Sequence, residues 1–341
     1  MRLPAISALF LMILPGCTSL AASSPAHSPP IHRPSLCDTA TAGRAPRAQG
    51  TLTPPRPGPL YGFWGLNGYT SPEGFADVEA RYGITVFQVA SSDPAWAVST
   101  LLPMVKAAGM RITLRLTPDH EAYTDAKGNF DLVMWENALL PWYGSGVQGF
   151  VDDGTLVGHM LLDDIQNFDG RDPDAAELDE MARCSKTLFP GLMTYVREKA
   201  SAMPPPDGGR YTWVDANVNQ YEAAEGPVGT YASAQAGAAR ALGLGVIMGL
   251  NIADGGDGSS RKAGYRAKHW AMSPAEILAD GRALASVPGV GMFLNWEYDA
   301  EEQWADGSIG ATYFNQPPLQ EALARLGAIV AANPAVPLLR P

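Results

Sequence analysis

Short apolar segments alternate with amphipathic segments along most of the chain after Pro59. The apolar segments are rich in β-branched and aromatic residues and have the length of buried strands. Eight such segments occur, at residues 61–67, 84–91, 110–117, 158–165, 192–198, 211–219, 245–251 and 290–298. The segments between them have helical spacing, and Ser71 and Ser273 each precede a proline where a helix would begin. The pattern predicts eight successive βα units.

A glycine turn comes directly before several of the apolar segments, as in AAGM at 107–110 and FPGL at 189–192. Repeats of this kind indicate parallel strands, because parallel strands cannot be joined by hairpins. Eight units close naturally into a barrel. The predicted fold class is therefore α/β, a single (β/α)8 TIM-barrel domain at residues 59–341. An open doubly wound sheet is the alternative, but no GxGxxG or Walker-type loop follows any of these strands.

The first 17 residues have a different composition. Arg2 is followed by an apolar run from Ala5 to Leu14, which is too short to span a bilayer as a helix. The LPGC sequence that follows resembles the lipobox of bacterial lipoproteins, which implies a signal peptide at residues 1–17 and lipidation of Cys17. An ordinary signal peptide cleaved near Ala21 is the alternative. Either leader would export the protein.

By the same resemblance, we expect a lipid-anchored protein of the bacterial cell envelope, at the outer membrane or the cell surface, because Thr18 follows Cys17 where a retained lipoprotein has Asp. Residues 18–58 are rich in Ser, Pro, Ala and Thr and have no apolar period, which predicts a disordered linker. An oxidising compartment would permit Cys37 and Cys184 to pair. Cys184 could equally be a small buried apolar residue.

The net charge of -11 opposes binding to phosphate backbones and to anionic lipid surfaces. We therefore expect no nucleic acid partner, and membrane contact only through the N-terminal anchor. No cofactor motif occurs, and the acidic residues of the loop at 253–260 do not have the EF-hand spacing. We expect a monomer that needs neither cofactor nor metal.

Polar and aromatic side chains gather toward the C-terminal ends of the predicted strands, which form the active-site mouth in barrels of this kind. The candidates are Trp64, Asn67, Arg115, Asp163, Asp164, Arg197, Asp215, Asn217, Asn251, Asn295, Trp296 and Glu297. Period-2 alternation places Asp215 and Asn217 on one face of their strand, and Asn295 and Glu297 on one face of theirs. Only one of Asp163 and Asp164 can point along the barrel axis, and the pattern does not choose between them.

Paired carboxyl groups suit cleavage of a glycosidic bond, which needs one acid to protonate the leaving oxygen and one carboxylate as nucleophile or base. Asp164, Asp215 and Glu297 are the catalytic candidates. Tryptophan faces and asparagine amides suit sugar rings and hydroxyls, and arginines keep neighbouring carboxylates ionised. The expected substrate-binding residues are Trp64, Asn67, Arg115, Asp163, Arg197, Asn217, Asn251, Asn295 and Trp296.

The LLDDI, WVDANVN and FLNWEY sequences, at 161–165, 213–219 and 293–298, resemble the barrel glycoside hydrolases. In the largest clan of those enzymes a Glu after Asn on the fourth strand is the acid/base and a Glu on the seventh strand is the nucleophile, but this chain has Asp163-Asp164 and Asn251 there. Other barrel glycosidases use an Asp on the fourth strand and an Asp on the sixth, which implies Asp164 and Asp215. The resemblance implies hydrolysis of an oligosaccharide or polysaccharide.

Three alternatives remain. A noncatalytic carbohydrate-binding or scaffold lipoprotein would keep the pocket without the paired acids. A polysaccharide lyase would use Arg115 and Arg197 to bind uronate carboxylates. A metal-dependent amidohydrolase would need an HxH pair on the first strand, whereas His120, His159 and His269 are scattered.

Overall fold

The computed structural model describes residues 35, 37–38, 58–67, 71–299, 303–334 and 336–338 of the 341-residue chain. The expected signal peptide at 1–17, with its lipidation site Cys17, and most of the expected linker at 18–58 lie outside these residues. Within them, no helix combines the length and the apolarity needed to cross a membrane.

Eight parallel strands form a closed barrel in which β1 pairs with both β2 and β8. The strands are β1 (Leu60–Asn67), β2 (Val86–Ala90), β3 (Arg111–Arg115), β4 (Leu156–Asp163), β5 (Met193–Arg197), β6 (Ala216–Tyr221), β7 (Gly245–Leu250) and β8 (Val290–Asp299). The predicted (β/α)8 barrel is confirmed, and the open doubly wound sheet is excluded because the strand order closes on itself.

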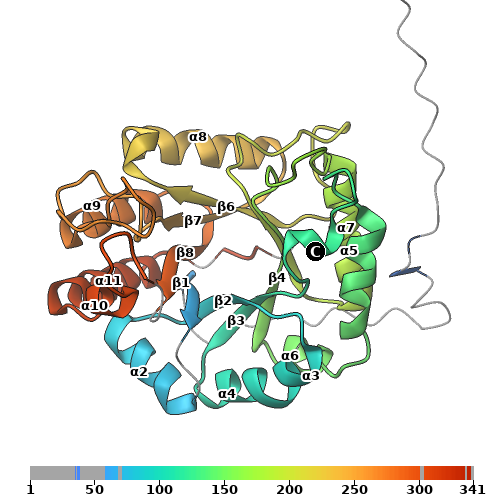
Figure 1. Cartoon of the computed structure of the whole chain (residues 1–341), viewed down its shortest axis with the longest axis horizontal. Coiled ribbons are helices and arrows are strands. Elements are labelled where there is room, and N and C mark those ends of the chain that lie inside the picture. Colours follow the sequence, from blue (N-terminus) through green and yellow to red (C-terminus); the bar gives the residue numbers. More distant parts are fainter. Residues whose placement is uncertain are drawn as a thin grey trace, which may run out of the picture. The chain divides into compact units, whose positions relative to one another are not determined.

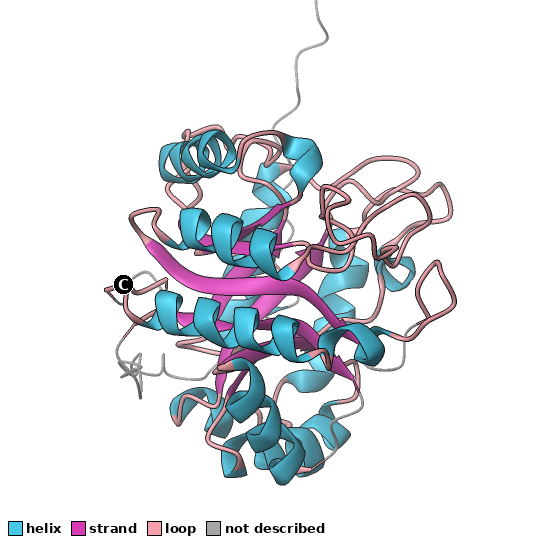
Figure 2. Cartoon of the chain, turned by 90° about the vertical axis from the view of Figure 1, so that its left-hand side faces the viewer, coloured by secondary structure: helices cyan, strands magenta, loops and turns pink. Residues whose placement is uncertain are grey.

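Helices surround the barrel and connect its strands (Figure 1). They are α2 (Pro72–Tyr82), α3 (Pro94–Trp96), α4 (Leu102–Ala107), α5 (Leu132–Leu139), α6 (Gln148–Asp152), α7 (Ala175–Leu188), α8 (Val228–Ala241), α9 (Pro274–Ala285), α10 (Gly310–Phe314) and α11 (Pro317–Ala331). A π-helical turn (Ala97–Leu101) and three 3₁₀ turns (His120–Tyr123, Leu140–Trp142 and Ala223–Glu225) complete the described helical elements. Figure 2 shows the strands inside the helical layer, with extended loops at one end.

Local capping explains where several helices begin. Ser71 caps α2 by accepting a hydrogen bond from the Gly74 amide, and the Pro72 ring has the φ angle that a first helical turn needs. A reciprocal capping box, Ser273 with Glu276, starts α9. The two serine caps predicted from the sequence are therefore present.

The core has two layers that follow the period-2 alternation of the strands. One cluster contains side chains of seven different strands, including Trp64, Met160, Tyr195 and Val218, and so fills the barrel interior. The larger cluster packs the outer faces of the strands against the helices. On β6, Ala216 and Val218 belong to the interior cluster, so Asn217 between them faces the helices.

A disulfide joins Cys37 to Cys184 on α7, with the two Cα atoms 5.4 Å apart. Neighbouring contacts reinforce it: the Ser35 hydroxyl donates to the buried Glu136 carboxylate, and the Asp38 carboxylate accepts from Arg183. The pairing that the sequence left open is therefore present. These described residues of the expected linker are attached to the outside of the barrel.

Candidate functional site

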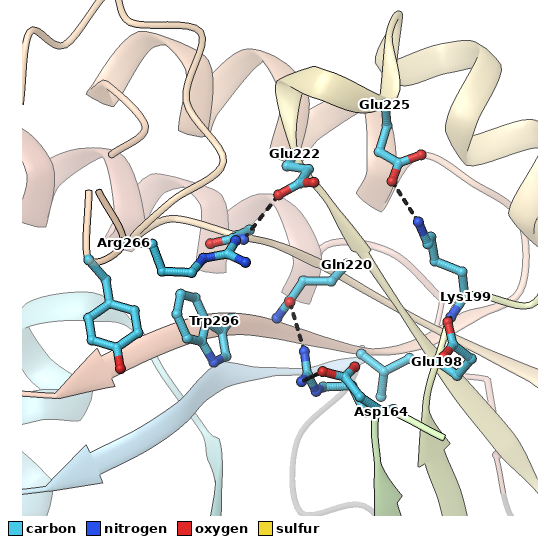
Figure 3. A pocket seen from close by; sticks show the side chains of 12 residues that line it. Asp164, Glu198, Lys199, Gln220, Glu222, Glu225, Arg266 and Trp296 are labelled. Atoms are coloured by element: carbon cyan, nitrogen blue, oxygen red, sulfur yellow. Dashed lines mark hydrogen bonds and ion pairs between the residues drawn. The ribbon is translucent and has the colours of Figure 1, made fainter. Parts of the chain in front are cut away.

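A cavity of about 300 Å³ opens at the C-terminal ends of β4 to β8. Its lining contains four carboxyl side chains, those of Asp164, Glu198, Glu222 and Glu225. It also contains Arg197, Lys199 and Arg266, together with Val218, Gln220, Asn251, Tyr265 and Trp296. Figure 3 shows Trp296 and Arg266 on one side of this cavity and Glu198 and Lys199 on the other.

Four of the residues expected at the mouth line this cavity: Asp164, Arg197, Asn251 and Trp296. Three more belong to the network of ion pairs and ring contacts around Arg197: Trp64, Arg115 and Asp163. The C-terminal ends of β4, β5, β7 and β8 therefore meet where the barrel rule predicts.

Arg197 organises one side of the cavity. Its Nε donates to Asp163, its Nη2 donates to Asp164 at 2.5 Å, and its Nη1 donates to Gln220 Oε1 at 3.3 Å. Its guanidinium lies against the Trp64 ring, 5.4 Å from the centroid. The sequence pattern allowed only one of the two adjacent aspartates to point along the barrel axis. Asp164 lines the cavity and Asp163 is not among its lining residues, although both bind Arg197. The left-handed backbone of Asp164, with φ of 50°, brings the two carboxylates to one cation.

Arg115 extends the same network. Its Nη2 donates to Asp119, and its Nη1 lies 4.0 Å from Asp163 Oδ2. Arg115 and Arg197 are thus both engaged with carboxylates of the protein. This arrangement disfavours the lyase alternative, in which these two arginines would bind uronate carboxylates.

Burial raises the pKa of the Asp164 carboxyl, an effect that the positive charge of Arg197 opposes and the negative charge of Asp163 reinforces. Burial also raises the pKa of Glu198, and the charge of Asp164 raises it further. Glu198 accepts a hydrogen bond from the Lys199 amide at 2.8 Å. Within the described residues it forms no ion pair, so it is the lining carboxyl best placed to hold a proton.

The remaining charged groups of the lining are mostly paired. Lys199 Nζ lies 2.7 Å from Glu225 Oε1, and Arg266 Nε lies 2.7 Å from the buried Asp254. Glu222 accepts a hydrogen bond from Asn251 Nδ2 at 3.3 Å. The charges of Lys199 and Arg266 are therefore each compensated by a carboxylate of the protein.

Trp296 and Tyr265 form an aromatic wall. Their ring centroids are 5.7 Å apart in an edge-to-face arrangement, and both side chains line the cavity. Aromatic faces beside amides and carboxylates are typical of sites for polar ring compounds such as sugars.

Asp215 does not lie at the mouth, and that prediction is wrong. It precedes β6 at the opposite end of the barrel, is fully buried, and binds Lys186 Nζ at 2.7 Å and the Thr194 amide at 2.8 Å. The apolar pattern placed the strand too early because it included Tyr211 to Val214. Those residues form a loop whose amide groups, from Thr212 to Val214, donate to the Asp179 carboxylate.

Asn217 and Asn295 are also misplaced by the sequence prediction, because each faces outward from the barrel. Asn217 alternates with the interior residues of β6, and its Nδ2 donates to the Glu198 carbonyl oxygen at 2.9 Å. Asn295 alternates with interior Leu294 and bonds the backbones of Gly62 and Leu250. Both are buried structural groups that connect neighbouring strands.

Two other candidates stay predictions. Asn67 ends β1, and its side chain lies outside what is described. Glu297 is partly buried on β8 beside Trp296 and is not among the residues that line the cavity.

Several lining residues were not site candidates in the sequence. β6 ends at Tyr221, and three lining residues lie at or just after that end: Gln220, Glu222 and Glu225. Correct alternation from Val218 would have found Gln220. Glu198 directly follows β5 and was visible as an acid at a strand end. Tyr265 and Arg266 come from the long segment between β7 and α9, where no periodic signal exists.

Potential metal ligands cluster once among the described residues, at Cys37, Glu136 and Cys184. The two thiols of this cluster are joined in the disulfide, so the cluster is structural. The scattered histidines do not meet at the mouth: His159, for example, is buried on β4 and bonds Ser185 of α7. The amidohydrolase alternative therefore has no histidine cluster to support it in the described part of the chain.

No protein-family model and no curated protein matches the sequence. Solved structures do resemble it. A GH113 β-1,4-mannanase has a TM-score of 0.51 at 9% identity, with 80% of this chain and 99% of that chain covered. A GH30 endoxylanase from Clostridium papyrosolvens C71 has a TM-score of 0.50 at 10% identity, covering 82% and 74%. A complex of Gas2 has a TM-score of 0.50 at 12% identity, covering 82% and 67%.

At such low identity the likeness shows the barrel fold. The mannanase and the endoxylanase are glycoside hydrolases. The architectural resemblance that the sequence suggested is therefore confirmed, without assignment to a particular family.

Proposed function

We propose that this protein is a glycoside hydrolase that cleaves an oligosaccharide or polysaccharide in the cavity lined by Asp164 and Glu198. One observation carries the proposal: Glu198 has a pKa raised by burial and by the charge of Asp164, while Arg197 binds Asp164 directly. Burial raises the pKa of Asp164 as well, but the ion pair with Arg197 favours the ionised form of Asp164. A carboxylic acid beside a carboxylate is what acid-assisted glycosidic cleavage requires. The hydrolytic activities named for the mannanase and the endoxylanase support the same reaction class.

In this mechanism Glu198 donates its proton to the glycosidic oxygen as the bond to the anomeric carbon breaks. Asp164 acts as the ionised partner, either attacking the anomeric carbon or taking a proton from the attacking water. Arg197 occupies Oδ2 of Asp164, and the Asp164 side chain is 44% exposed, so the carboxylate remains accessible from the cavity. Asp215, which sequence reasoning favoured for a catalytic role, takes no part.

Substrate binding would use the rest of the lining. The wall formed by Trp296 and Tyr265 offers apolar ring surface to a sugar. Gln220 accepts from Arg197 through Oε1, and its Nε2 has no hydrogen-bond partner among the described residues. This donor is buried, and a rotation of the Gln220 side chain toward the cavity that it lines would let it donate to a substrate hydroxyl, since buried polar groups are normally hydrogen-bonded.

The cellular setting is part of the proposal. Export and lipidation at Cys17 would place the barrel in the cell envelope, where polysaccharides are available. Incorporation of labelled palmitate into the wild-type chain, and its loss in Cys17→Ser, would test this independently of catalysis.

The decisive experiment compares hydrolysis of a glycan panel by the wild type, Asp164→Asn, Glu198→Gln and Glu222→Gln. We expect Asp164→Asn and Glu198→Gln to lose about 10²- to 10⁴-fold in kcat, the usual contribution of a positioned acid or base. Glu198→Gln should lose least on aryl glycosides whose leaving group needs no protonation. Glu321→Gln, on the exposed face of α11, serves as the matched control.

Folded Asp164→Asn and Glu198→Gln variants that hydrolyse glycans at the wild-type rate would refute this assignment of roles. If only Glu222→Gln were inactive, the base would be the carboxyl that follows β6. Glycan binding without hydrolysis by any of the proteins would favour the noncatalytic carbohydrate-binding lipoprotein.

A further inference from the structure

Trp270 is a large aromatic side chain that the fold leaves 43% exposed. It belongs to the segment between the end of β7 at Leu250 and the start of α9 at Pro274. That segment begins at the C-terminal end of a barrel strand, so it lies on the same side of the barrel as the cavity. Tyr265 and Arg266 of the same segment line the cavity itself.

The backbone around Trp270 is fixed on two sides. Its carbonyl accepts a hydrogen bond from the Gly256 amide at 2.8 Å, and bridges pair it with Gly255 and with Ala263. The indole lies beside Gly258, where a Cβ atom would stand 3.4 Å from Nε1. Gly258 has a φ of 93°, a conformation that side-chain-bearing residues rarely adopt. The backbone of Trp270 is therefore held in place, with the indole beside Gly258.

Gly255 connects Trp270 to the cavity wall. A Cβ atom on Gly255 would lie 3.0 Å from Glu222 Cβ and 2.9 Å from Asn251 Cβ, and both of those residues line the cavity. The Trp270 backbone pairs with this same Gly255. Gly255 thus links Trp270 to the Glu222 and Asn251 wall.

We propose that Trp270 is an outer sugar-binding platform, on which one ring of a glycan stacks while neighbouring rings of the same chain occupy the cavity. This proposal rests on the proposed glycoside hydrolase function and adds that the substrate is a chain longer than the cavity. The cavity volume of about 300 Å³ is at the small end of ligand sites, so most of an oligosaccharide would extend outside it. An exposed indole provides apolar surface, and its two side-chain torsions limit the conformational entropy lost on binding.

Trp213 provides a matched control. It is 42% exposed, close to the value for Trp270, but it lies in the loop before β6, at the opposite end of the barrel. Its amide donates to the Asp179 carboxylate. A general effect of removing a surface tryptophan should appear in both variants, whereas a platform effect should appear in one.

The test measures binding of dimers and hexamers of β-1,4-linked mannose, xylose, glucose and glucosamine by calorimetry. Full-length protein carrying Asp164→Asn is the parent, so that bound glycans are not cleaved. We expect Trp270→Ala to weaken binding of the preferred hexamer about tenfold, the ratio that corresponds to 1.4 kcal/mol. Dimer binding should be unchanged, Trp270→Phe should restore most of the hexamer affinity, and Trp213→Ala should bind like the parent.

Equal hexamer affinity in the parent and in Trp270→Ala would overturn the platform and leave the hydrolase proposal standing. A parent that binds none of these glycans would overturn both proposals. Hexamer binding that depends on Trp270, in a wild-type protein that hydrolyses nothing, would support the platform and refute only the hydrolase.

Discussion

The guanidinium of Arg197 lies against the ring of Trp64, with Cζ 5.4 Å from the ring centroid. Trp64 belongs to the interior cluster of the barrel, and Arg197 uses its nitrogens to bind Asp163, Asp164 and Gln220. A buried aromatic face attracts a cation and restricts its orientation. The position of the proposed catalytic Asp164 therefore depends on a packing contact one layer below it.

Arg197→Gln should raise the pKa of Asp164, because it removes the cation that opposes the effect of burial. A smaller fraction of Asp164 is then ionised at acidic pH, so the acidic limb of the activity profile should move to higher pH. Carbon NMR titration of the Asp164 carboxyl checks the shift without relying on activity. Arg197→Lys keeps the charge and should raise the pKa of Asp164 less. Trp64→Leu should raise that pKa by an amount between those of the two Arg197 variants. An unchanged titration in Arg197→Gln would show that Arg197 does not control Asp164.

Asp215→Asn should lower the free energy of unfolding by about 3 to 5 kcal/mol, because it leaves Lys186, whose side chain is only 12% exposed, without its fully buried partner. The ion pair of Asp77 with Arg81 is the matched control, since both of its side chains are more than 40% exposed. Asp77→Asn should cost less than about 1 kcal/mol. Urea denaturation measures both values. A loss of less than about 1 kcal/mol in Asp215→Asn would contradict the structural role of this pair.

Asp215 illustrates what the sequence could and could not predict. Repetition over eight units made the barrel predictable, because each unit repeats the same strand, helix and glycine turn. The misplaced start of β6 has a tertiary cause: Asp179 on α7 accepts the amide groups of a distant loop, and no local pattern encodes that. An error of a few residues on that one strand moved Asp215 to the wrong end of the barrel and concealed Glu222.

Two further features were beyond pattern analysis for other reasons. Asp164 lies just past the end of β4 in a left-handed conformation, so the strand pattern did not predict that both aspartates reach one arginine. Tyr265 enters the cavity from a long irregular segment whose path depends on many hydrogen bonds. Strand ends were predictable sources of site residues, whereas long loops were not.

His159 should make the protein less stable in acid. Burial lowers the pKa of this histidine to about 3, whereas an unfolded histidine titrates near 6.5. Between pH 6.5 and pH 3 this histidine binds a proton in the unfolded chain but not in the folded chain. The free energy of unfolding therefore falls by about 1.4 kcal/mol for each pH unit of acidification in that range. Urea denaturation from pH 7 to pH 4 should show a shallower decline in His159→Phe, which keeps a ring against Trp135. Parallel curves for the two proteins would contradict this.

Reduction of the disulfide should lower stability without altering the cavity. Cys37 and Cys184 are 147 residues apart in sequence, and crosslinks that close long loops typically contribute about 2 to 5 kcal/mol. Dithiothreitol should therefore lower the midpoint of urea unfolding in the wild type. The doubly substituted Cys37→Ser, Cys184→Ser protein should start at the lower midpoint and not respond. An unchanged midpoint of urea unfolding in the reduced wild type would show that the crosslink contributes no stability.

The charge balance of the cavity predicts which glycans it accepts. Arg197, Lys199 and Arg266 each pair with a carboxylate of the protein, whereas Glu198 and Glu222 form no ion pair among the described residues. Since Glu198 is proposed to be protonated, Glu222 carries the uncompensated negative charge. A uronate polymer would bring further negative charge beside it, and a glycan with free amino groups would bring the opposite charge. Neutral and amino-sugar glycans should therefore bind in preference to polyuronates.

Glu222 is the residue through which this preference can be tested, because Glu198 is proposed to be protonated. Glu222→Gln keeps the hydrogen-bonding capacity toward Asn251 and removes one negative charge. We expect it to weaken glucosamine hexamer binding by up to about fivefold and to leave mannose hexamer binding unchanged. Added salt should reduce the difference between the wild type and the variant, because screening weakens an exposed charge pair. Tighter binding of polygalacturonate than of mannan by the wild type would instead mean that a substrate carboxylate displaces Asp164 or Glu225 from its cation.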